Sequence, residues 1–258
     1  MPFARKRFGQ HFLHDPATVA RILEAVDARP GEALVEIGPG RGALTGGLMA
    51  AAGALDAVEI DRDLAAALRA AWATRPGFVL HEADALGFDF GALAAQRGQR
   101  LRVVGNLPYN ISTPLMFHLL RTPAAVHDLH VMLQREVIDR ICAPPGSGDY
   151  GRLTVMLAPW VEARALFEVG PGAFRPPPRV WSAVARLTVR AEPAFEVDAR
   201  YGRVVAAAFA QRRKTLRNAL RSLLDAGAIE GCGIDPAARP ETLEPAQFGA
   251  LARLLPSG

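Results

Sequence analysis

Val103-Val104-Gly105-Asn106-Leu107-Pro108-Tyr109-Asn110 is the stretch from which both the fold and the site can be predicted. The mostly apolar run over Leu101–Val104, which ends in two β-branched valines, predicts a buried strand that breaks at Gly105. Pro108 cannot donate a backbone hydrogen bond to a sheet, so the chain has to leave the strand there. Asn106 and Tyr109 therefore stand on a stiff turn past the carboxyl end of a strand, where open α/β sheets bind ligands.

This turn combines an amide, backbone carbonyls and an aromatic face. Such a set suits a planar heterocycle that bears an amino group, because the heterocycle can stack while its amino group donates to the oxygens. Asparagine and proline are also common in ordinary turns, so the stretch alone leaves a plain strand-to-loop connection equally open. The rest of the chain favours the binding interpretation.

A second junction lies upstream, where Ala33–Ile37 predicts a strand that runs into Gly38-Pro39-Gly40-Arg41-Gly42. A helix is expected from Leu44, so the glycines would bring backbone and a helix N-terminus close to a ligand. Gly38 to Ala43 also satisfies the pattern G-x-G-x-x-A, which makes a nicotinamide dehydrogenase a rival interpretation.

Further strands and helices alternate along the chain. We expect strands over Leu55–Ile60, Phe78–His81, Leu129–Leu133 and Val184–Val189, a helix over Leu64–Trp72, and a strand or covering helix over Leu153–Trp160. This rhythm predicts an α/β fold with a doubly wound, mostly parallel, Rossmann-like sheet that carries helices on both faces. Successive strands end in Gly38 with Gly40, Glu59, Asp84 and Asn106. A carboxylate about twenty residues after the glycines suits ribose hydroxyls, so the series predicts a nucleoside ligand.

The composition is that of a globular protein, with 258 residues of which 50% are hydrophobic and 22% charged. The net charge of +4 is compatible with a polyanion partner without requiring one.

Cys142 and Cys232 form no C-x-x-C pair and are expected to be free thiols in a reducing cytoplasm. We expect no signal peptide, no membrane span and a cytoplasmic location. His127-x-x-His130 lacks acidic or thiol partners, so no metal site is expected.

Local signals mark the ends of several elements. Residues 1–14 are basic and aromatic, and the apolar Phe8, Phe12 and Leu13 are expected to fold back on the body. Asp15-Pro16 predicts a capped helix start. Ser112 and Thr113 are interpreted as caps of a helix that begins at Pro114.

A domain boundary is predicted near Ala191, with residues 1–190 as the ligand-binding domain and residues 191–258 as a small helical domain. Arg213, Arg217 and Arg221 recur every four residues and would share one helix face. An apolar stripe would oppose them, formed by Val205, Phe209, Leu216, Leu220 and Leu223. Like charges repel one another, so a polyanion partner is favoured over a face that simply meets solvent.

Pro39 inside the glycine turn, the second acid Asp84 and the Asn-Leu-Pro-Tyr turn fit a smaller adenosine ligand better than a dinucleotide. S-adenosylmethionine has that outline, since it joins an adenine and a ribose to a charged amino-acid tail.

Motifs that span nearly the whole chain then point to one family. They are Arg5–Leu13, Glu36–Gly40, Val58–Asp61, Asn106–Thr113, Met132–Val137, Tyr150–Leu153, Phe174–Val180 and Gln211–Asn218. In this order they resemble the ribosomal RNA adenine dimethyltransferases, and the bacterial 16S type more than relatives that act on 23S rRNA. Trp181 departs from the pattern, because that subfamily usually has Asp before Ser-Ala-Val.

The resemblance implies a class I methyltransferase that uses S-adenosylmethionine to dimethylate the exocyclic amine of two adjacent adenines near the 3′ end of 16S rRNA. Its partner would be the small ribosomal subunit or its precursor, and a monomer without a metal is expected. A ribosome-binding or assembly module with a residual cofactor pocket stays open as an alternative.

The resemblance also implies roles for particular residues. The implied catalytic residues are Asn106, Leu107, Pro108, Tyr109 and Phe174, with oxygens of the turn accepting from the adenine amine and the two rings stacking on the base. Phe174 has an alternative as an ordinary core residue. The donor would be held by His11, Leu13, Gly38, Gly40, Glu59, Asp84 and Asn106. RNA would be bound by Arg5, Lys6, Arg7, Arg213, Arg217 and Arg221.

Overall fold

The computed structural model describes residues 11–72, 74–211 and 213–256, and the chain forms two compact units. The first unit runs to Ile138 and resumes over Ala163–Ala191, and the second takes Asp139–Glu162 and continues from Glu192. The later division falls beside the predicted boundary near Ala191. Residues 139–162 were expected in the first domain but pack in the second unit. Among the described residues, none of the helices has the length and apolar character needed to cross a membrane.

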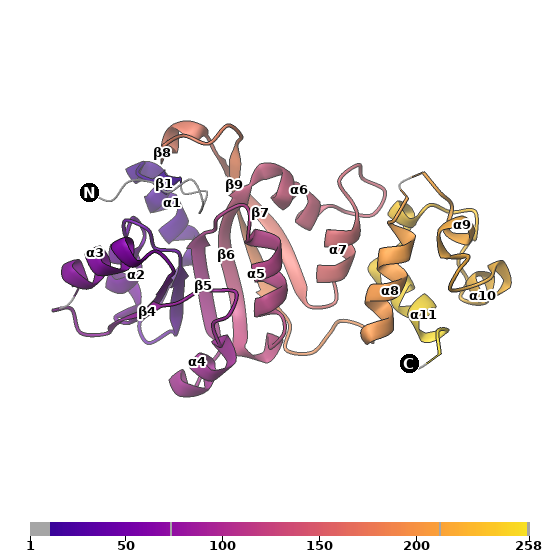
Figure 1. Ribbon diagram of the computed structural model, residues 1–258, viewed down its shortest axis with the longest axis horizontal. Helices are drawn as coiled ribbons and strands as arrows, with labels where there is room; N and C mark the ends of the chain where they lie inside the picture. Colours follow the sequence, from indigo (N-terminus) through magenta and orange to yellow (C-terminus); the bar gives the residue numbers. More distant parts are fainter. Residues whose placement is uncertain (1–10, 73, 212, 257–258) are drawn as a thin grey trace. The chain divides into compact units, whose positions relative to one another are not determined.

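The first unit is built on a seven-stranded sheet with the order β4-β3-β2-β5-β6-β9-β7 (Figure 1). Its strands are β2 (Leu34–Ile37), β3 (Leu55–Glu59), β4 (Phe78–Glu82), β5 (Leu101–Asn106), β6 (Val126–Gln134), β7 (Val161–Val169) and β9 (Ser182–Val189). β4, β3, β2, β5 and β6 run parallel, and β9 is antiparallel to β6. The chain winds outward from β2 in both directions, so the switch point where such sheets bind ligands lies between β2 and β5. The mostly parallel, doubly wound prediction is confirmed, whereas strand β7 was not predicted.

Gly105 does not end strand β5 as predicted, because the strand continues to Asn106. A Cβ atom on Gly105 would lie 2.6 Å from the Ile37 carbonyl oxygen and 2.9 Å from a Leu107 methyl carbon. Only glycine therefore lets β5 pass this close to the end of β2. The consequence is that Asn106 is still positioned by the sheet rather than by a loop.

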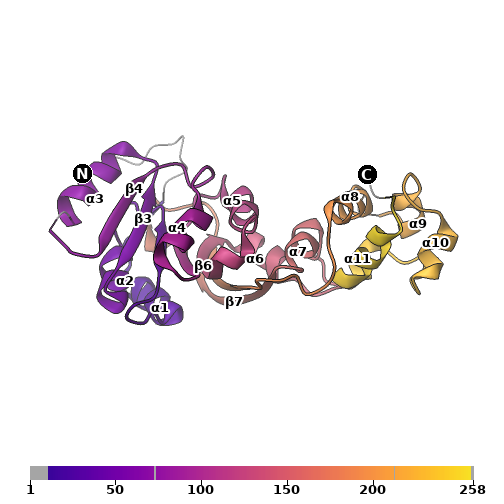
Figure 2. The same cartoon turned by 90° about the horizontal axis from the view of Figure 1, so that it is seen from below.

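Helices cover both faces of the sheet, with α1 and α2 on one side and α4 and α5 on the other (Figure 2). The helices of this part of the chain are α1 (Pro16–Val26), α2 (Thr45–Ala52), α3 (Arg62–Trp72), α4 (Phe90–Arg97), α5 (Ser112–Leu119) and α6 (Arg135–Cys142). Asp15 caps α1 as predicted, because its carboxylate accepts a 2.8 Å hydrogen bond from the Thr18 N–H. The predicted caps of α5 are wrong: the helix begins at Ser112, whose hydroxyl donates to the Tyr109 carbonyl instead.

The N-terminal segment returns to the body through a two-stranded sheet. β1 (Phe12–Leu13) pairs antiparallel with β8 (Phe174–Arg175), so Leu13 lies opposite Phe174. Phe12 and Leu13 are buried, which confirms the expectation that they fold back, while Phe8 lies outside the described residues. This pairing brings the first described residues to the ligand edge of the main sheet.

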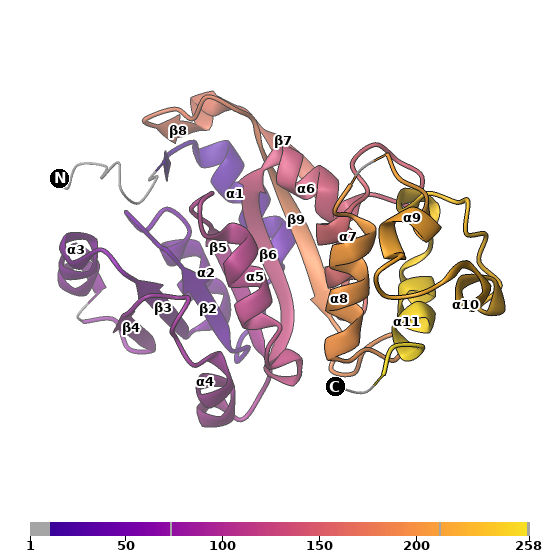
Figure 3. The ribbon, with the colours of Figure 1, turned by 45° about the vertical axis from the view of Figure 1, so that its right-hand side comes forward.

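The second unit packs short helices around a core of its own (Figure 3). They are α7 (Arg152–Leu157), α8 (Ala199–Ala208), α9 (Leu216–Leu220), α10 (Ala226–Gly231) and α11 (Pro245–Arg253). The predicted apolar stripe does enter this core, but the single helix that was to carry it is wrong. Arg213 lies in the connection between α8 and α9, so the three arginines do not form one helical stripe.

Candidate nucleoside and methyl-transfer site

A cavity of about 330 Å³ opens at the carboxyl ends of β2, β3 and β5 and next to β1. It has the size of a small-molecule site. Ten residues predicted from the sequence line it together: His11, Leu13, Gly38, Gly40, Glu59, Asp84, Asn106, Leu107, Pro108 and Tyr109. The tertiary structure therefore gathers both the predicted donor site and the predicted catalytic turn around one space.

The glycine turn after β2 forms one wall. Gly38 and Gly40 have φ angles of 65° and 58°, a conformation that side chains disfavour. The Gly38 N–H donates to the Val58 carbonyl at 2.9 Å, which leaves the Gly38 carbonyl as the group for a ligand. A Cβ atom on Gly40 would lie 3.2 Å from the Phe12 ring, so the absent side chain also makes room for the N-terminal segment.

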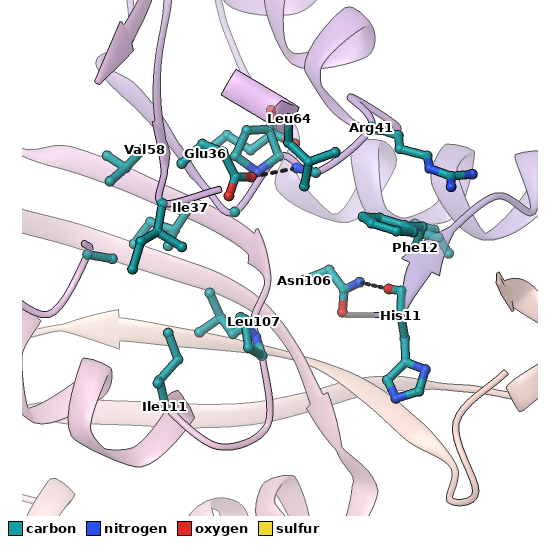
Figure 4. A pocket seen from close by; sticks show the side chains of 18 of the residues that line it. His11, Phe12, Glu36, Ile37, Arg41, Val58, Leu64, Asn106, Leu107 and Ile111 are labelled. Atoms are coloured by element: carbon teal, nitrogen blue, oxygen red, sulfur yellow. Dashed lines mark hydrogen bonds between the residues drawn. The ribbon is translucent and has the colours of Figure 1, made fainter. Parts of the chain in front are cut away.

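Phe12 is a site residue that the sequence-based reasoning placed only in the fold. Its ring lines the cavity, and the Arg41 guanidinium lies 4.5 Å above the ring centroid (Figure 4). Cation–π contact of this kind fixes the ring against the glycine turn. The alternation of His11, Phe12 and Leu13 indicated that neighbouring side chains take opposite faces. Which face each of them takes depends on the pairing of β1 with β8.

Glu59 stands at the end of β3 and is almost fully buried. Its two carboxylate oxygens accept from the Gly40 N–H at 3.1 Å and from the Asp61 N–H at 2.9 Å. Burial raises the pKa of Glu59, while those backbone hydrogen bonds oppose the rise. Each oxygen keeps a second lone pair, so the carboxylate can still accept from ligand hydroxyls.

Asp84 follows β4 and is exposed at the rim. One of its oxygens accepts from the Leu86 N–H at 2.9 Å. This bond holds the side chain in a local turn and leaves the other oxygen available to a ligand.

Glu36 lines the same cavity from within β2, although the sequence assigned it no role beyond its place in the Glu36–Gly40 motif. Burial raises its pKa from 4.5 to about 7; the 2.6 Å hydrogen bond from the Thr45 hydroxyl opposes this, and the Glu59 carboxylate adds to it. Glu36 therefore changes protonation near neutral pH, beneath the glycine turn and at the start of α2. The raised pKa of Glu36 could be found only from the packing around its side chain, because an acidic residue in a predicted strand does not by itself indicate an unusual pKa.

The Asn106 amide is oriented by the N-terminal segment. Its Nδ2 donates to the His11 carbonyl at 2.9 Å, so the amide nitrogen is occupied and Oδ1 remains as an acceptor in the cavity (Figure 4). In the turn that follows, the Pro108 carbonyl already accepts from the Ile111 N–H at 3.1 Å. The Leu107 carbonyl is therefore the better second acceptor of the two that were predicted.

Tyr109 is held by contacts at both ends of its side chain. Its hydroxyl lies 2.8 Å from the Ser182 hydroxyl, and its ring lies against that of His11 with centroids 5.9 Å apart and planes at 29°. The His11 Nδ1 in turn donates to the Pro176 carbonyl at 2.8 Å. Burial raises the pKa of the Tyr109 phenol and the Ser182 bond opposes the rise.

Phe174 was predicted to be part of the site, but it does not line the cavity. Its side chain is 2% exposed and packs in the hydrophobic core with Leu13, and it is absent from the residues that line the cavity. The alternative of an ordinary core residue is the one that the structure favours, because β8 turns this side chain toward the body.

The predicted RNA-binding residues are not part of this cavity. Arg5, Lys6 and Arg7 lie outside the described residues. Arg213, Arg217 and Arg221 are exposed in the second unit, where Arg221 and Lys214 border a shallow depression of about 110 Å³. Over the described ranges no group of three or more His, Cys, Asp or Glu side chains is arranged to hold a metal ion.

A doubly wound sheet with a glycine turn and an amide-proline turn at one switch point defines the class of S-adenosylmethionine-dependent class I methyltransferases. The model of the ribosomal RNA adenine dimethylase family matches residues 2–256. The chain belongs to that family.

Individual relatives agree with this. The chain is 53% identical over 254 residues to a ribosomal RNA small subunit methyltransferase A of Pseudomonas aeruginosa, covering 98% of this chain and 94% of that protein. It is 52% identical to the protein of that name from Methylococcus capsulatus, with 97% of each covered. Among solved structures, the 23S rRNA methyltransferase ErmE is 30% identical with a TM-score of 0.73, over 95% of this chain and 99% of that one. A dimethyladenosine transferase from Plasmodium falciparum shares the fold, with 22% identity, a TM-score of 0.78 and 93% and 96% of the chains covered.

Proposed function

We propose that this protein dimethylates the exocyclic amine of two adjacent adenines near the 3′ end of 16S rRNA, with S-adenosylmethionine as the donor. The observation that carries the proposal is the Asn106 amide, which lines the cavity and donates an Nδ2 hydrogen to the His11 carbonyl, so that its Oδ1 is left as an acceptor. The choice of small-subunit rRNA rests on relatives that carry that activity in their names.

The residues of the cavity fit the donor. Glu59 and Asp84 would take the ribose hydroxyls and the adenine amine, and the Gly38 carbonyl would accept from the amino group of the methionine end. Phe12 and Leu13 of β1 would close over it, together with His11 just before that strand. When bound, the donor supplies a methyl group on a positively charged sulfur. The apolar wall formed by Phe12 and Leu13 would keep water away from that centre.

The adenine amine is a poor nucleophile, because its lone pair is delocalised into the ring. The Asn106 Oδ1 and the Leu107 carbonyl would accept its two N–H groups and draw the nitrogen toward sp³ geometry, which takes its lone pair out of conjugation with the ring. The same oxygens stabilise the positive charge that grows on the nitrogen during attack, and they do so without rearranging. A strong base is not required, since the proton becomes acidic once the new N–C bond forms.

Tyr109 would stack on one face of an adenine that has left its helix. Stacking of a base on an aromatic ring contributes about 1–3 kcal/mol, which offsets part of the cost of unstacking. The Ser182 hydroxyl and the His11 ring hold Tyr109 in place before RNA arrives. Arg217 and Arg221 would contact RNA phosphates from the second unit, with Arg213 beside them in the preceding connection.

The test is to incubate small subunits that lack adenine methylation with the protein and S-adenosylmethionine, and to map modified nucleotides by mass spectrometry. We expect two adjacent dimethyladenosines near the 3′ end of 16S rRNA. Methyl transfer only at other positions of 16S rRNA, or binding without transfer, would overturn the proposal. The second of these outcomes would favour the assembly-module alternative.

A further inference from the structure

Trp181 is a large aromatic side chain that the site described above does not use. It is 51% exposed, more than any other large hydrophobic residue that the structure describes, and Val180 beside it is 44% exposed. Trp72 and Trp160 are only partly exposed. An indole left in solvent costs free energy that a ligand can recover, so its surroundings are informative.

The indole is held in place rather than free to swing. Its six-membered ring lies over Gly170, where an added Cβ atom would meet two ring carbons at 3.7 Å. The Trp181 carbonyl accepts from the Arg135 N–H at 2.9 Å, and β9 begins at the next residue, Ser182. A ring fixed in this way loses little conformational freedom when something stacks on it.

Residues 176–181 connect β8 to β9, and both ends of this connection lie beside the catalytic turn. At its start, the Pro176 carbonyl accepts from His11, whose ring lies against Tyr109. At its end, Ser182 is hydrogen-bonded to the Tyr109 hydroxyl. Trp181 is thus one residue away from a direct partner of the ring that we expect to stack on the target adenine.

The charges around Trp181 suit an anionic chain. Arg175, at the end of β8, and Arg179, within the connection, are exposed, and neither has a carboxylate partner among the described residues. Glu168, two residues before Gly170, lies 3.5 Å from Arg135 and so is paired. An aromatic face flanked by arginines is the arrangement that binds single-stranded nucleic acid, with stacking on the base and cations along the backbone.

We propose that Trp181 is a stacking platform for a nucleobase that flanks the target adenine in the RNA. The ligand is an unpaired base of the same RNA strand, and Arg179 would contact its phosphate. Trp181 is therefore a specificity-determining residue that positions the strand, not a catalytic one. The inference rests on the proposed function and deepens it.

The test combines a protein change with an RNA change. Small subunits are reconstituted with 16S rRNA in which single nucleotides on either side of the adenine pair are made abasic. On intact RNA, Trp181→Ala should raise KM by roughly 5- to 150-fold, the range expected for one stacked base, with kcat nearly unchanged. With one particular abasic RNA, wild type should be weakened to the same extent and Trp181→Ala should cause no further loss.

Matched variants separate stacking from bulk. Trp181→Phe should recover most of the loss because it keeps an aromatic face, whereas Trp181→Leu should not. Val180→Ala removes exposed apolar area without a ring and should change KM less than twofold. As a direct readout, Trp72→Phe combined with Trp160→Phe leaves Trp181 as the only tryptophan, and its fluorescence should be quenched by intact but not by the abasic subunit.

The outcomes are distinguishable. If wild type fails to methylate intact subunits, the proposed function is wrong. If wild type methylates them and Trp181→Ala has an unchanged KM, only the stacking platform is wrong. If Trp181→Ala raises KM by the same factor on every abasic RNA as on intact RNA, the stacking platform is also wrong. That result would indicate that Trp181 contacts a ribosomal protein.

Discussion

Replacing Asn106 by alanine should remove two interactions whose effects can be measured separately. The first is the 2.9 Å hydrogen bond from Nδ2 to the His11 carbonyl, which ties β1 to the catalytic turn. Its loss should cost about 1 kcal/mol, and should weaken donor binding roughly fivefold because His11–Leu13 close the donor site. The second is the Oδ1 acceptor, which is used only when charge grows on the adenine amine. By analogy with single groups that stabilise transition-state charge, its loss should lower kcat by about 10²–10³-fold.

The assay follows transfer of radiolabelled methyl groups to unmethylated small subunits, with calorimetry of donor binding and filter binding of the subunit. Asn106→Asp keeps an acceptor but cannot donate to the His11 carbonyl, so it should impair donor binding while losing less kcat than Asn106→Ala. Gln99→Ala is a matched control, because Gln99 also donates an amide N–H to a backbone carbonyl, that of Gly31 at 2.8 Å, outside the cavity. Turnover of Asn106→Ala within tenfold of wild type, with donor and subunit both bound, would refute the reasoning.

Three further predictions concern the acid under the glycine turn, the close approach of two strands and the arginines of the second unit. The pKa of Glu36 is about 7 in the folded protein, against 4.5 in the unfolded chain. The stabilisation of the fold by this side chain is therefore complete below pH 4.5. It falls by about 3 kcal/mol as the pH rises from there through 7. Glu36→Gln keeps an acceptor for the Thr45 hydroxyl. Measured by urea unfolding, the stability of this variant relative to wild type should rise by about 3 kcal/mol between about pH 5 and pH 8. A stability difference that does not vary with pH would contradict this prediction. Gly105→Ala should destabilise the first unit by about 3 kcal/mol because its Cβ would meet the Ile37 carbonyl at 2.6 Å, whereas Gly172→Ala, with nothing within 4 Å, should leave the melting temperature nearly unchanged. Arg217→Ala and Arg221→Ala should each reduce the slope of log Kd against log salt for small-subunit binding by about 1. The control Arg253→Ala should leave the slope unchanged, because the Arg253 side chain lies 3.9 Å from Glu196. Equal slopes for all variants would mean that Arg217 and Arg221 meet only solvent.

The features that the sequence determined by itself are local ones. Strand and helix periodicity predicted the parallel sheet, and Pro108 predicted where the chain leaves β5, because each depends only on neighbouring residues. Parallel strands place their carboxyl ends at one edge, so Gly38, Glu59, Asp84 and Asn106 could be grouped from the sequence alone. The outcome was a cavity lined by all four.

Other features were decided only by contacts between residues far apart in the chain. Gly105 looked like the end of a strand, but it is a point of close approach to Ile37, which local sequence cannot reveal. Phe174 faces the core rather than the cavity, since the pairing of β8 with β1 sets its direction. The regular spacing of Arg213, Arg217 and Arg221 suggested one helix, yet the core of the second unit is closed by two shorter ones.

The chemistry of the site shows the same division. The types of residue needed for a nucleoside and an amine acceptor were readable from the chain, because donors and acceptors are properties of side chains. The protonation of Glu36 and the orientation of the Asn106 amide depend on burial and on a partner 95 positions away. Such properties exist only after the sheet has assembled, because dielectric environment and hydrogen-bond partners are supplied by tertiary packing.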